Sequence, residues 1–287
     1  MIYLEQFQTV SRQEEELYLN DTRSTCFQTF YPFQVFCYRE LPRFTFDPVT
    51  IFAGGNGSGK STLLNIIAEK LGVRRQSLFN RSSFFDDYVK GCDHWLSSQK
   101  ELPGKSKIIT SDDVFDALLH LRGLNEGIDT RREDLFCEYT EMKKANVRLR
   151  TFNDIDDLKK NNDARRKTRS QYVRERLMQN PRELSNGESA FAYFTEAIED
   201  HALYLLDEPE NSLSAAFQLK LARFIEDSAR FFHCQFIVAT HSPFLLALPF
   251  AKIYDLDETP PQNKTWTKLA NIEVYRDFFK EHEGEFS

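Results

Sequence analysis

The chain alternates short apolar runs with segments whose apolar residues recur at helical spacing. Four of these runs end abruptly in polar residues, which is typical of strands buried in a parallel sheet. The runs occupy residues 49–53, 107–110, 203–207 and 236–240. Directly after the first run, residues 60–71 place leucines and isoleucines on one helical face and end at Gly72. This alternation predicts an α/β fold with a mixed, mainly parallel core sheet.

Residues 33–38 and 43–46 predict two further strands, which form an N-terminal antiparallel β piece. The turn Asp47-Pro48 then leads the chain into the first buried run. Four aromatic residues lie in or beside the first of these strands: Tyr31, Phe33, Phe36 and Tyr38. One of them could stack on an adenine ring, but packing in the core is the favoured interpretation for each.

The segment between the second and third runs predicts an inserted helical arm. Ser111 can cap a helix over residues 114–121, and Gly123 and Gly127 are expected to break it. Two more helical stretches follow, at about 130–146 and 154–178, and Pro181 ends the second. We therefore expect residues 1–287 to form a single domain with a helical insertion at about 130–183.

Composition indicates a globular cytoplasmic protein. The 287 residues include 26 Phe and are 41% hydrophobic, enough for a sizeable core. No apolar run approaches the roughly 18 residues of a membrane span, and the first residues do not read as a secretory signal. The five cysteines are scattered and include no C-x-x-C pair, which favours reduced thiols over a disulfide framework or a zinc site.

The stretch that connects the first run to its helix fits the pattern G-x-x-x-x-G-K-[ST] of a phosphate-binding loop. Glycines allow backbone N–H groups to surround phosphate oxygens, and the helix N-terminus attracts negative charge. A lysine adds a point charge, and a serine hydroxyl can bind Mg²⁺. A strand precedes the loop and a helix follows it, so the sequence predicts a site for a nucleoside triphosphate and Mg²⁺. Its residues are Gly54, Gly55, Asn56, Gly57, Ser58, Gly59, Lys60, Ser61 and Thr62.

Three more stretches place candidate functional residues at the ends of predicted strands or at the start of a predicted helix. Asp207 and Glu208 end the third run, where the first acid can hold Mg²⁺ and the second can accept a proton from water. His241 follows the fourth run. The segment Leu184–Glu188 (Leu-Ser-Asn-Gly-Glu) precedes a helical pattern and, taken alone, could be only a capping box.

In this order and spacing, the four motifs resemble the ATPase head of ABC-type proteins, especially the soluble branch that includes RecF, SMC and OLD proteins and a group of small bacterial ATPases. The resemblance implies that Ser61 and Asp207 hold Mg²⁺, with Lys60, Glu208 and His241 as catalytic residues. It also implies that Ser185, Asn186, Gly187 and Glu188 form a signature loop that acts on the ATP of a second copy. The Leu-Ser-Asn-Gly-Glu signature departs from the usual transporter sequence, and no clear Q-loop glutamine is present.

Three classes of function follow from this resemblance. The favoured one is a soluble ATPase that dimerises head-to-tail on ATP, in nucleic-acid maintenance or in defence against foreign DNA. The alternatives are the nucleotide-binding subunit of a membrane transporter and an ATP-gated binding module that does not hydrolyse ATP. An effector protein is a further candidate partner, and insertion into a membrane is not expected.

The arm differs from the rest of the chain in charge. Residues 143–176 contain twelve basic and five acidic residues, whereas the whole chain has a net charge of −7. Such a run is either a solvated face or a contact for nucleic-acid phosphates. The candidate DNA or RNA contacts are Lys159, Lys160, Arg165, Arg166, Lys167 and Arg169.

Overall fold

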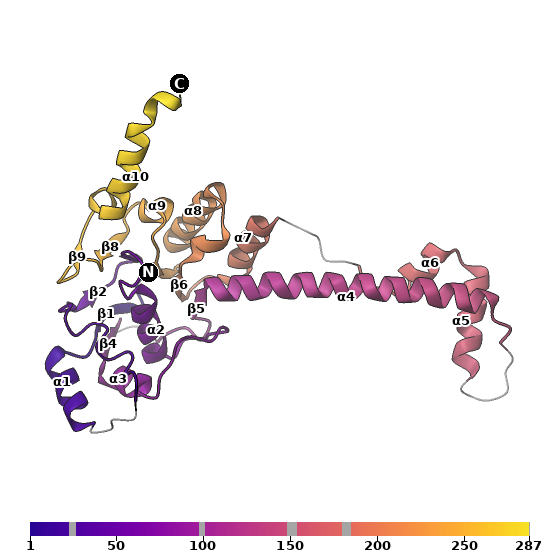
Figure 1. Ribbon diagram of the computed structural model, residues 1–287, viewed down its shortest axis with the longest axis horizontal. Coiled ribbons are helices and arrows are strands. Elements are labelled where there is room, and N and C mark those ends of the chain that lie inside the picture. The colour runs from indigo at the N-terminus through magenta and orange to yellow at the C-terminus, as the bar shows by residue number, and fades with distance from the viewer. Residues whose placement is uncertain (23–26, 98–100, 148–153, 180–184, 287) are drawn as a thin grey trace. The chain divides into compact units, whose positions relative to one another are not determined.

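The computed structural model describes residues 1–22, 27–97, 101–147, 154–179 and 185–286 (Figure 1). The chain divides into two compact units. The first contains Met1–Phe115 and Asn186–Ser287, and the second contains Asp116–Ser185. The helical insertion predicted at about 130–183 falls within the second unit.

A six-stranded sheet in the order β5-β6-β7-β3-β8-β9 forms the centre of the first unit. Every neighbouring pair is parallel except β8 and β9, so the prediction of a mixed, mainly parallel sheet is confirmed. All five residues of β3 and of β7 are buried, which explains why these strands read as continuous apolar runs. The strands are β3 (Val49–Ala53), β5 (Lys107–Thr110), β6 (Leu203–Asp207), β7 (Gln235–Ala239), β8 (Lys252–Asp255) and β9 (Gln262–Asn263).

Helix α2 (Lys60–Leu71) begins directly after the glycine-rich loop and packs against β6 and β7. Its buried Leu63, Leu64 and Ile67 join the main core, and Gly72 ends the helix in the left-handed conformation with φ 63°. Helices α7 (Asn186–Ala197) and α8 (Ala215–Phe231) pack against each other, and α8 also contacts β7. The predicted strand–loop–helix context of the phosphate-binding motif is therefore present.

The N-terminal antiparallel piece is also present, as a three-stranded sheet in the order β2-β1-β4. It consists of β1 (Leu4–Gln8), β2 (Phe44–Thr45) and β4 (Asp93–Leu96). One link to the main sheet is the side chain of Gln235 in β7, which is fully buried, and another joins Thr45 of β2 to Tyr254 of β8. The Gln235 Oε1 accepts from the Tyr3 and Leu4 N–H groups at 2.7 and 2.9 Å, and Nε2 donates to the Leu4 carbonyl at 2.9 Å.

The prediction of a strand over residues 33–38 is wrong. These residues form successive turns, and Phe33 and Phe36 insert into the core while Tyr38 is 76% exposed. Aromatic residues recurring in a short segment suggested a strand, but packing around irregular backbone uses them equally well. Two helices, α1 (Arg12–Asp21) and α3 (Phe85–Gly91), were also not predicted, because each is short.

The expected break at Gly123 and Gly127 does not occur. Helix α4 (Ser111–Lys144) runs through both glycines, and no atom lies close to the position that a Cβ would take at either one. In the second unit, α5 (Asp154–Arg166) and α6 (Arg169–Arg174) replace the predicted helix over 154–178. Thr168 separates them as the N-cap of α6, and Pro181 lies outside the described residues. The small core of this unit is Leu135, Tyr139, Ala164, Tyr172 and Val173.

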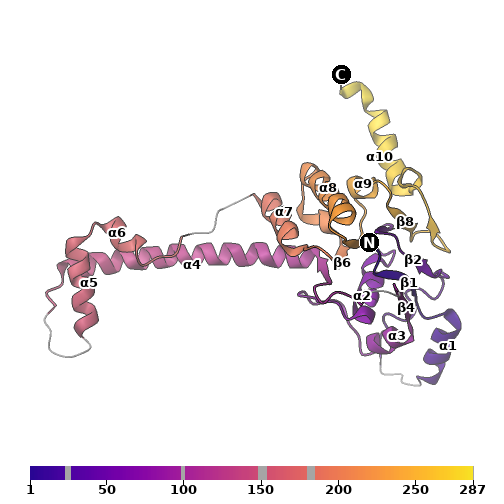
Figure 2. The same ribbon diagram turned by 180° about the vertical axis from the view of Figure 1, so that it is seen from behind.

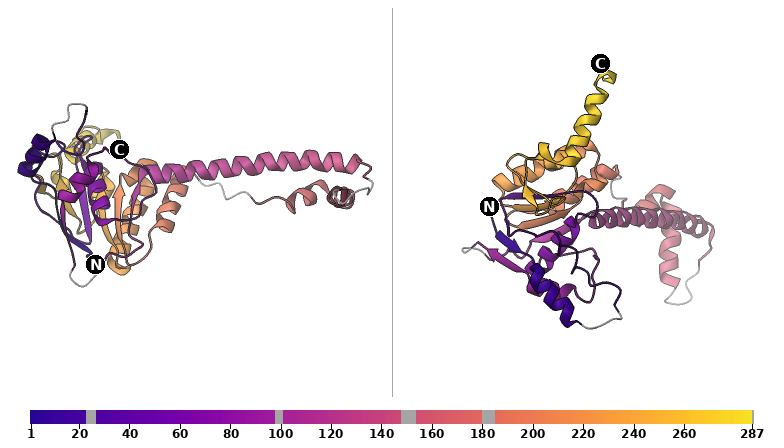
Figure 3. Two further views of the ribbon diagram at one scale, coloured as in Figure 1. Left: turned by 90° about the horizontal axis from the view of Figure 1, so that it is seen from below. Right: turned by 60° about the vertical axis from the view of Figure 1, so that its left-hand side comes forward.

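After β7 the chain continues in the first unit through α9 (Pro243–Leu246), β8 and β9, and then forms α10 (Ala270–Glu281). Figure 2 and Figure 3 show these elements and the strands of this unit from further sides. Among the described residues, no helix combines the length and apolar character needed to cross a bilayer.

The buried amide of Gln235 leads to a stability prediction. Gln235→Met keeps the shape of the side chain but removes the hydrogen bonds that Gln235 makes with two backbone N–H groups and one carbonyl. Each lost partner costs about 1–3 kcal/mol, so we expect a loss of several kcal/mol in the free energy of unfolding. Gln262→Met, at an exposed position in β9, is the matched control and should change it by less than about 0.5 kcal/mol. Denaturant unfolding of both variants measures the difference, and equal stabilities would contradict the assigned role.

Candidate functional site

Three motifs that are far apart in the sequence meet at one edge of the main sheet. Strands β6, β7 and β3 are neighbours and parallel, so their carboxyl ends lie together. The phosphate-binding loop follows β3, Asp207 and Glu208 lie at the end of β6, and His241 follows β7. In open α/β sheets, ligands bind outside the carboxyl ends of the strands.

The loop is tightly built around Lys60 and Gly59. Lys60 is 4% exposed, and its Nζ donates to the Gly54 and Gly55 carbonyls at 2.9 and 3.0 Å. Gly59 precedes α2 with φ 93°, and a Cβ there would lie 2.6 Å from a ring carbon of Phe36. Both the backbone conformation and the close ring therefore require glycine at position 59.

Two residues that the sequence analysis did not single out brace this loop. The Arg39 guanidinium donates to the Ser58 carbonyl at 2.6 Å and to the Leu256 carbonyl at 2.7 Å. The Asp257 carboxylate accepts from the Gly55 N–H at 2.8 Å. Asp257 follows the end of β8, beside β3, but no strand was predicted there, so its position at a strand end was not recognised. Arg39 lies in irregular backbone and had no comparable signal.

The residues expected to hold Mg²⁺ are in contact. The Ser61 hydroxyl, in the first turn of α2, donates to Asp207 Oδ1, at the end of β6, with a distance of 2.9 Å. A hydroxyl and a carboxylate are the hard oxygen ligands that Mg²⁺ prefers, and it commonly takes its other ligands from phosphate and water. The two side chains therefore fit the ion, although no group of three or more His, Cys, Asp or Glu exists in the described part of the chain to hold a metal without such ligands.

Glu208 lies between the lysine of the loop and the histidine after β7. Its Oε1 is 3.9 Å from Lys60 Nζ and 3.7 Å from His241 Nδ1, while its Oε2 accepts from the Asn211 amide at 3.0 Å. The backbone of Glu208 is left-handed, with φ 46° and ψ 53°, and its N–H donates to the Ala239 carbonyl. A non-glycine residue in this conformation is uncommon and often marks a functional site.

A protein-family model matches part of the chain. Residues 127–247 match the family model described as "AAA domain, putative AbiEii toxin, Type IV TA system". This match includes the signature segment, Asp207, Glu208 and His241, but not the phosphate-binding loop. A comparison with curated protein sequences gives no match.

Solved structures with similar chains include SMC heads and a transporter cassette. The Pyrococcus furiosus SMC head bound to the C-terminal domain of ScpA is 13% identical over 99% of this chain and 100% of that one, with a TM-score of 0.43. The Thermotoga maritima SMC head domain is 14% identical over 92% and 99%, with a TM-score of 0.41. A nucleotide-free ATP-binding cassette from an ABC transporter is 12% identical over 96% and 99%, with a TM-score of 0.44.

The chain has an α/β fold with a mixed, mainly parallel sheet and a phosphate-binding loop motif between β3 and α2, and part of it matches a family of AAA domains. Its signature segment is only partly described: Leu184 lies outside the described residues, and Asn186, Gly187 and Glu188 form the first turn of α7 directly after Ser185. Gly187 lies against Phe217, where a Cβ would meet a ring carbon at 3.1 Å. The structure therefore brings together the loop, Asp207, Glu208 and His241, whereas the signature residues begin a separate helix.

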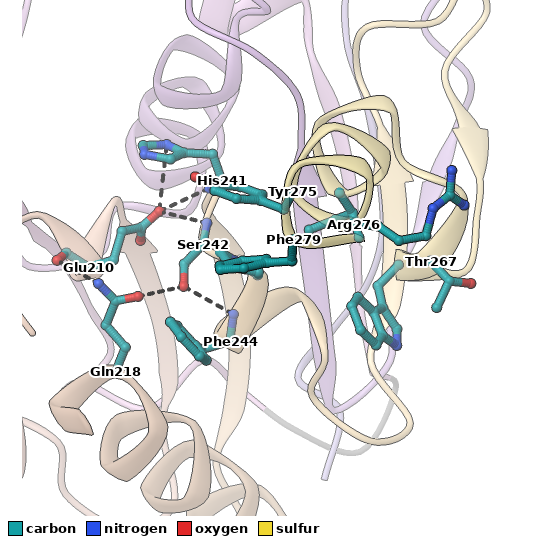
Figure 4. Close-up of a pocket in the computed structure, with 12 residues that line it drawn as sticks. Glu210, Gln218, His241, Ser242, Phe244, Thr267, Tyr275, Arg276 and Phe279 are labelled. Atoms are coloured by element: carbon teal, nitrogen blue, oxygen red, sulfur yellow. Dashed lines mark hydrogen bonds and ion pairs between the residues drawn. The ribbon is translucent and has the colours of Figure 1, made fainter. Parts of the chain in front are cut away.

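Glu210 is the most informative site residue that the sequence analysis did not single out. It is 5% exposed, and its Oε1 accepts from Thr240 Oγ1 at 2.6 Å, the His241 N–H at 2.9 Å and the Ser242 N–H at 3.1 Å. One carboxylate oxygen thus binds the turn after β6 to the backbone that carries His241 (Figure 4). The Asp-Glu-Pro-Glu sequence was visible, but only the tertiary contact distinguishes this glutamate from a solvated one.

Asp207 leads to a prediction about pH. Burial raises the pKa of Asp207 from 3.8 to about 6, against the lowering effect of the Ser61 hydrogen bond. The folded state therefore keeps a proton that the unfolded chain has lost, and stability falls as the pH rises from about 4 to 6. Asp207→Asn removes this effect, so in protein free of metal and nucleotide it should add about 1–3 kcal/mol to the free energy of unfolding at pH 7.5.

Unfolding at pH 7.5 and at pH 4.5 measures this gain, which should shrink at the lower pH. Asp200→Asn is the control of opposite sign, because the hydrogen bond from Lys105 lowers the pKa of Asp200. A gain for Asp207→Asn that is the same at both pH values would contradict the assignment.

Proposed function

We propose that this protein binds and hydrolyses ATP and that ATP joins two copies head-to-tail. The observation that carries the proposal is the meeting of Lys60, the Ser61–Asp207 pair and the Glu208–His241 pair at the carboxyl ends of three adjacent parallel strands. Each group supplies one requirement of phosphoryl transfer: phosphate binding, a metal position and activation of water.

In this proposal, the backbone of residues 55–62 and Lys60 hold the phosphates, and Ser61 and Asp207 hold Mg²⁺. Glu208 is the general base, and His241 positions the attacking water and contacts the γ-phosphate. The close approach of Lys60 to Glu208 supports these roles, because it places the proposed base beside the lysine that would bind the phosphates.

The dimer follows from the position of the signature residues. Ser185, Asn186, Gly187 and Glu188 belong to a helix start separate from the loop, and helix starts attract anions. We propose that this helix start closes on the γ-phosphate bound to a second copy. Two shared sites of this kind would make the dimer depend on ATP.

The cellular process that this protein serves is a separate part of the proposal. The description of the matching family names a toxin of a toxin–antitoxin system, which favours defence or nucleic-acid maintenance over transport. The transporter subunit and the non-hydrolysing binding module are the competing proposals. Phosphate release from ATP discriminates against the non-hydrolysing module, and co-purification with a membrane protein would favour the transporter subunit.

Glu208→Gln tests hydrolysis and dimerisation together. The variant keeps the shape of the side chain but cannot accept a proton, so turnover should fall by about 10²–10⁴-fold while ATP remains bound. The unhydrolysed ATP should then hold two copies together. Light scattering with ATP and Mg²⁺ measures the mass, and a monomer with ATP bound would exclude the dimer.

Two additional substitutions in the Glu208→Gln variant test which residues bind ATP and which join the two copies. Lys60→Ala should abolish ATP binding and with it the dimer. Ser185→Arg should prevent the dimer while leaving ATP bound to each monomer, because the signature loop is proposed to act in trans. A Ser185→Arg variant that still dimerises on ATP would contradict the trans assignment.

The nucleic-acid proposal for the arm is modified by the structure. Lys160 pairs with Glu138 at 3.2 Å, and Lys167 pairs with Glu175 at 2.6 Å and with Asp163 at 3.2 Å. These cations are partly neutralised inside the second unit. Arg165 and Arg166 remain exposed. Within the described residues, Arg165 donates to the Ala145 carbonyl and not to a carboxylate. These two arginines are therefore the better candidates for phosphate contacts.

Two double variants with the same change in charge test the arm. If the arm binds nucleic-acid phosphates, Arg165→Gln with Arg166→Gln should weaken DNA binding regardless of sequence and reduce the salt slope by about 2, one for each contact. Lys160→Gln with Lys167→Gln should mainly destabilise the second unit. Fluorescence anisotropy at several salt concentrations measures both, and equal binding by the arginine variant and the wild type would remove the arm from this role.

A further inference from the structure

A pocket of about 350 Å³ lies against β5, the strand at one end of the main sheet. Its lining comes from residues 74–76 after α2, from residues 105–109 and from the α7 region, and all of it belongs to the first unit. Lys107, at the amino end of β5, pairs with Tyr204 of β6, three residues before Asp207. At about 3.3 Å per residue, Lys107 lies about 10 Å along the strands from the level of Asp207. This pocket is therefore separate from the candidate ATP site.

Two cations of the pocket lie side by side across the edge of the sheet. Arg74 and Lys107 form a parallel bridge, in which the Arg74 N–H donates to the Ser106 carbonyl and the Ile108 N–H donates to the Arg74 carbonyl, both at 3.0 Å. Paired residues on neighbouring strands extend their side chains to the same face, about 4.8 Å apart at the backbone. Like charges directly opposite each other destabilise a sheet, so this pair favours the binding of an anion.

The carboxylates around the pocket are paired with its other two cations. Lys105 Nζ lies 2.6 Å from Asp200 Oδ1 and 3.7 Å from Oε2 of Glu199, which is the one carboxylate in the lining. Arg75 Nε lies 3.9 Å from Glu69 Oε1. Lys105 and Arg75 are therefore largely compensated within the protein.

Arg74 and Lys107 have no such compensation. Neither makes an ion pair within the part of the chain that the structure describes. Burial lowers the pKa of Lys107 and the charge of Arg74 adds to this effect, while Glu199 and Asp113 oppose it from a longer distance. Arg74 is exposed and Lys107 is half-buried, so both can be reached by a ligand. The pocket thus offers two accessible positive charges without a paired carboxylate.

The rest of the lining can hold the organic part of a ligand. The Tyr193 hydroxyl donates to Gln76 Oε1 at 3.0 Å, which leaves the amide N–H groups of Gln76 available to a bound molecule. The ring of Tyr193 and the side chain of Ile109 add apolar area. The volume is near the lower end of the range of about 300–1,000 Å³ found for ligand pockets, which favours a small molecule.

We propose that this pocket binds a small phosphate monoester. Such a group carries close to two negative charges at pH 7.5, which match Arg74 and Lys107, whereas a carboxylate carries only one. The guanidinium of Arg74 binds two phosphate oxygens, and the ammonium of Lys107 binds a third as a point charge. The organic part packs against Tyr193. Glu199 at the rim limits the number of negative charges that the pocket accepts.

Calorimetric titration with phenyl phosphate tests the site, with benzoate as the probe that has the same ring and a single charge. The Lys60→Ala protein is used without ATP, because removal of this lysine weakens phosphate binding at the loop. Phenyl phosphate should bind saturably at pH 7.5, and benzoate should bind at least about tenfold more weakly. No saturable binding of phenyl phosphate, or equal binding of benzoate, overturns the proposal.

Two double variants with the same change in charge locate the ligand. Arg74→Gln with Lys107→Gln should weaken the binding of phenyl phosphate by at least about tenfold. Arg223→Gln with Lys268→Gln removes two exposed cations of the first unit that do not line the pocket, and the affinity should not change. Equal effects of the two double variants would show general charge attraction and would overturn the assigned position.

Thermal unfolding without ligand separates a binding role from a structural one. Arg74→Gln with Lys107→Gln removes a repulsion, so its midpoint of unfolding should not lie below that of the control double variant. A lower midpoint would mean that the two cations are compensated inside the protein, and it would overturn the charge argument.

A single-stranded oligonucleotide distinguishes a small ligand from a nucleic-acid backbone. Its presence should leave the affinity for phenyl phosphate unchanged. Displacement of phenyl phosphate by the oligonucleotide, together with loss of oligonucleotide binding in the Arg74→Gln, Lys107→Gln variant, would assign these cations to nucleic acid and overturn the proposal of a small ligand. Because neither titration contains ATP, the result does not depend on ATP hydrolysis.

Discussion

Parallel pairing of β3, β7 and β6 is the constraint on which the site depends. The first two strands are entirely buried, and the pairing brings the ends of segments nearly 200 residues apart to one edge. Hydrophobic burial therefore holds the strands in place, and the polar groups at their ends gain proximity without long side chains or flexible loops. The same burial disfavours ionised side chains at this edge, and it raises the pKa of Asp207.

The charged groups at that edge form a connected set rather than independent pairs. Glu208 lies within 4 Å of both Lys60 and His241, and Glu210 holds the backbone on which His241 is carried. Removing one of these side chains leaves a neighbouring charge without its partner in a partly buried site. The effects of single substitutions on stability are therefore expected to be non-additive.

In the arm, part of the basic charge seen in the sequence forms ion pairs within the folded second unit. In the sequence, residues 159–171 contain many cations and almost no apolar side chains. In the structure, Asn161 and Ala164 of this stretch are buried, and Asp163 pairs with Arg176 and Lys167. Part of the basic charge stabilises the second unit itself, and fewer residues than the composition suggests remain as candidates for a partner.

The sequence by itself determined the parallel core, the strand–loop–helix unit and the residues that meet at the sheet edge. Those signals are local: apolar runs, helical spacing and glycines at defined offsets. Only the tertiary structure decided the roles of Arg39, Asp257 and Glu210, the continuity of α4 through two glycines and the turns at residues 33–38. These features depend on contacts between distant residues, and the energy of such contacts cannot be read from local propensity.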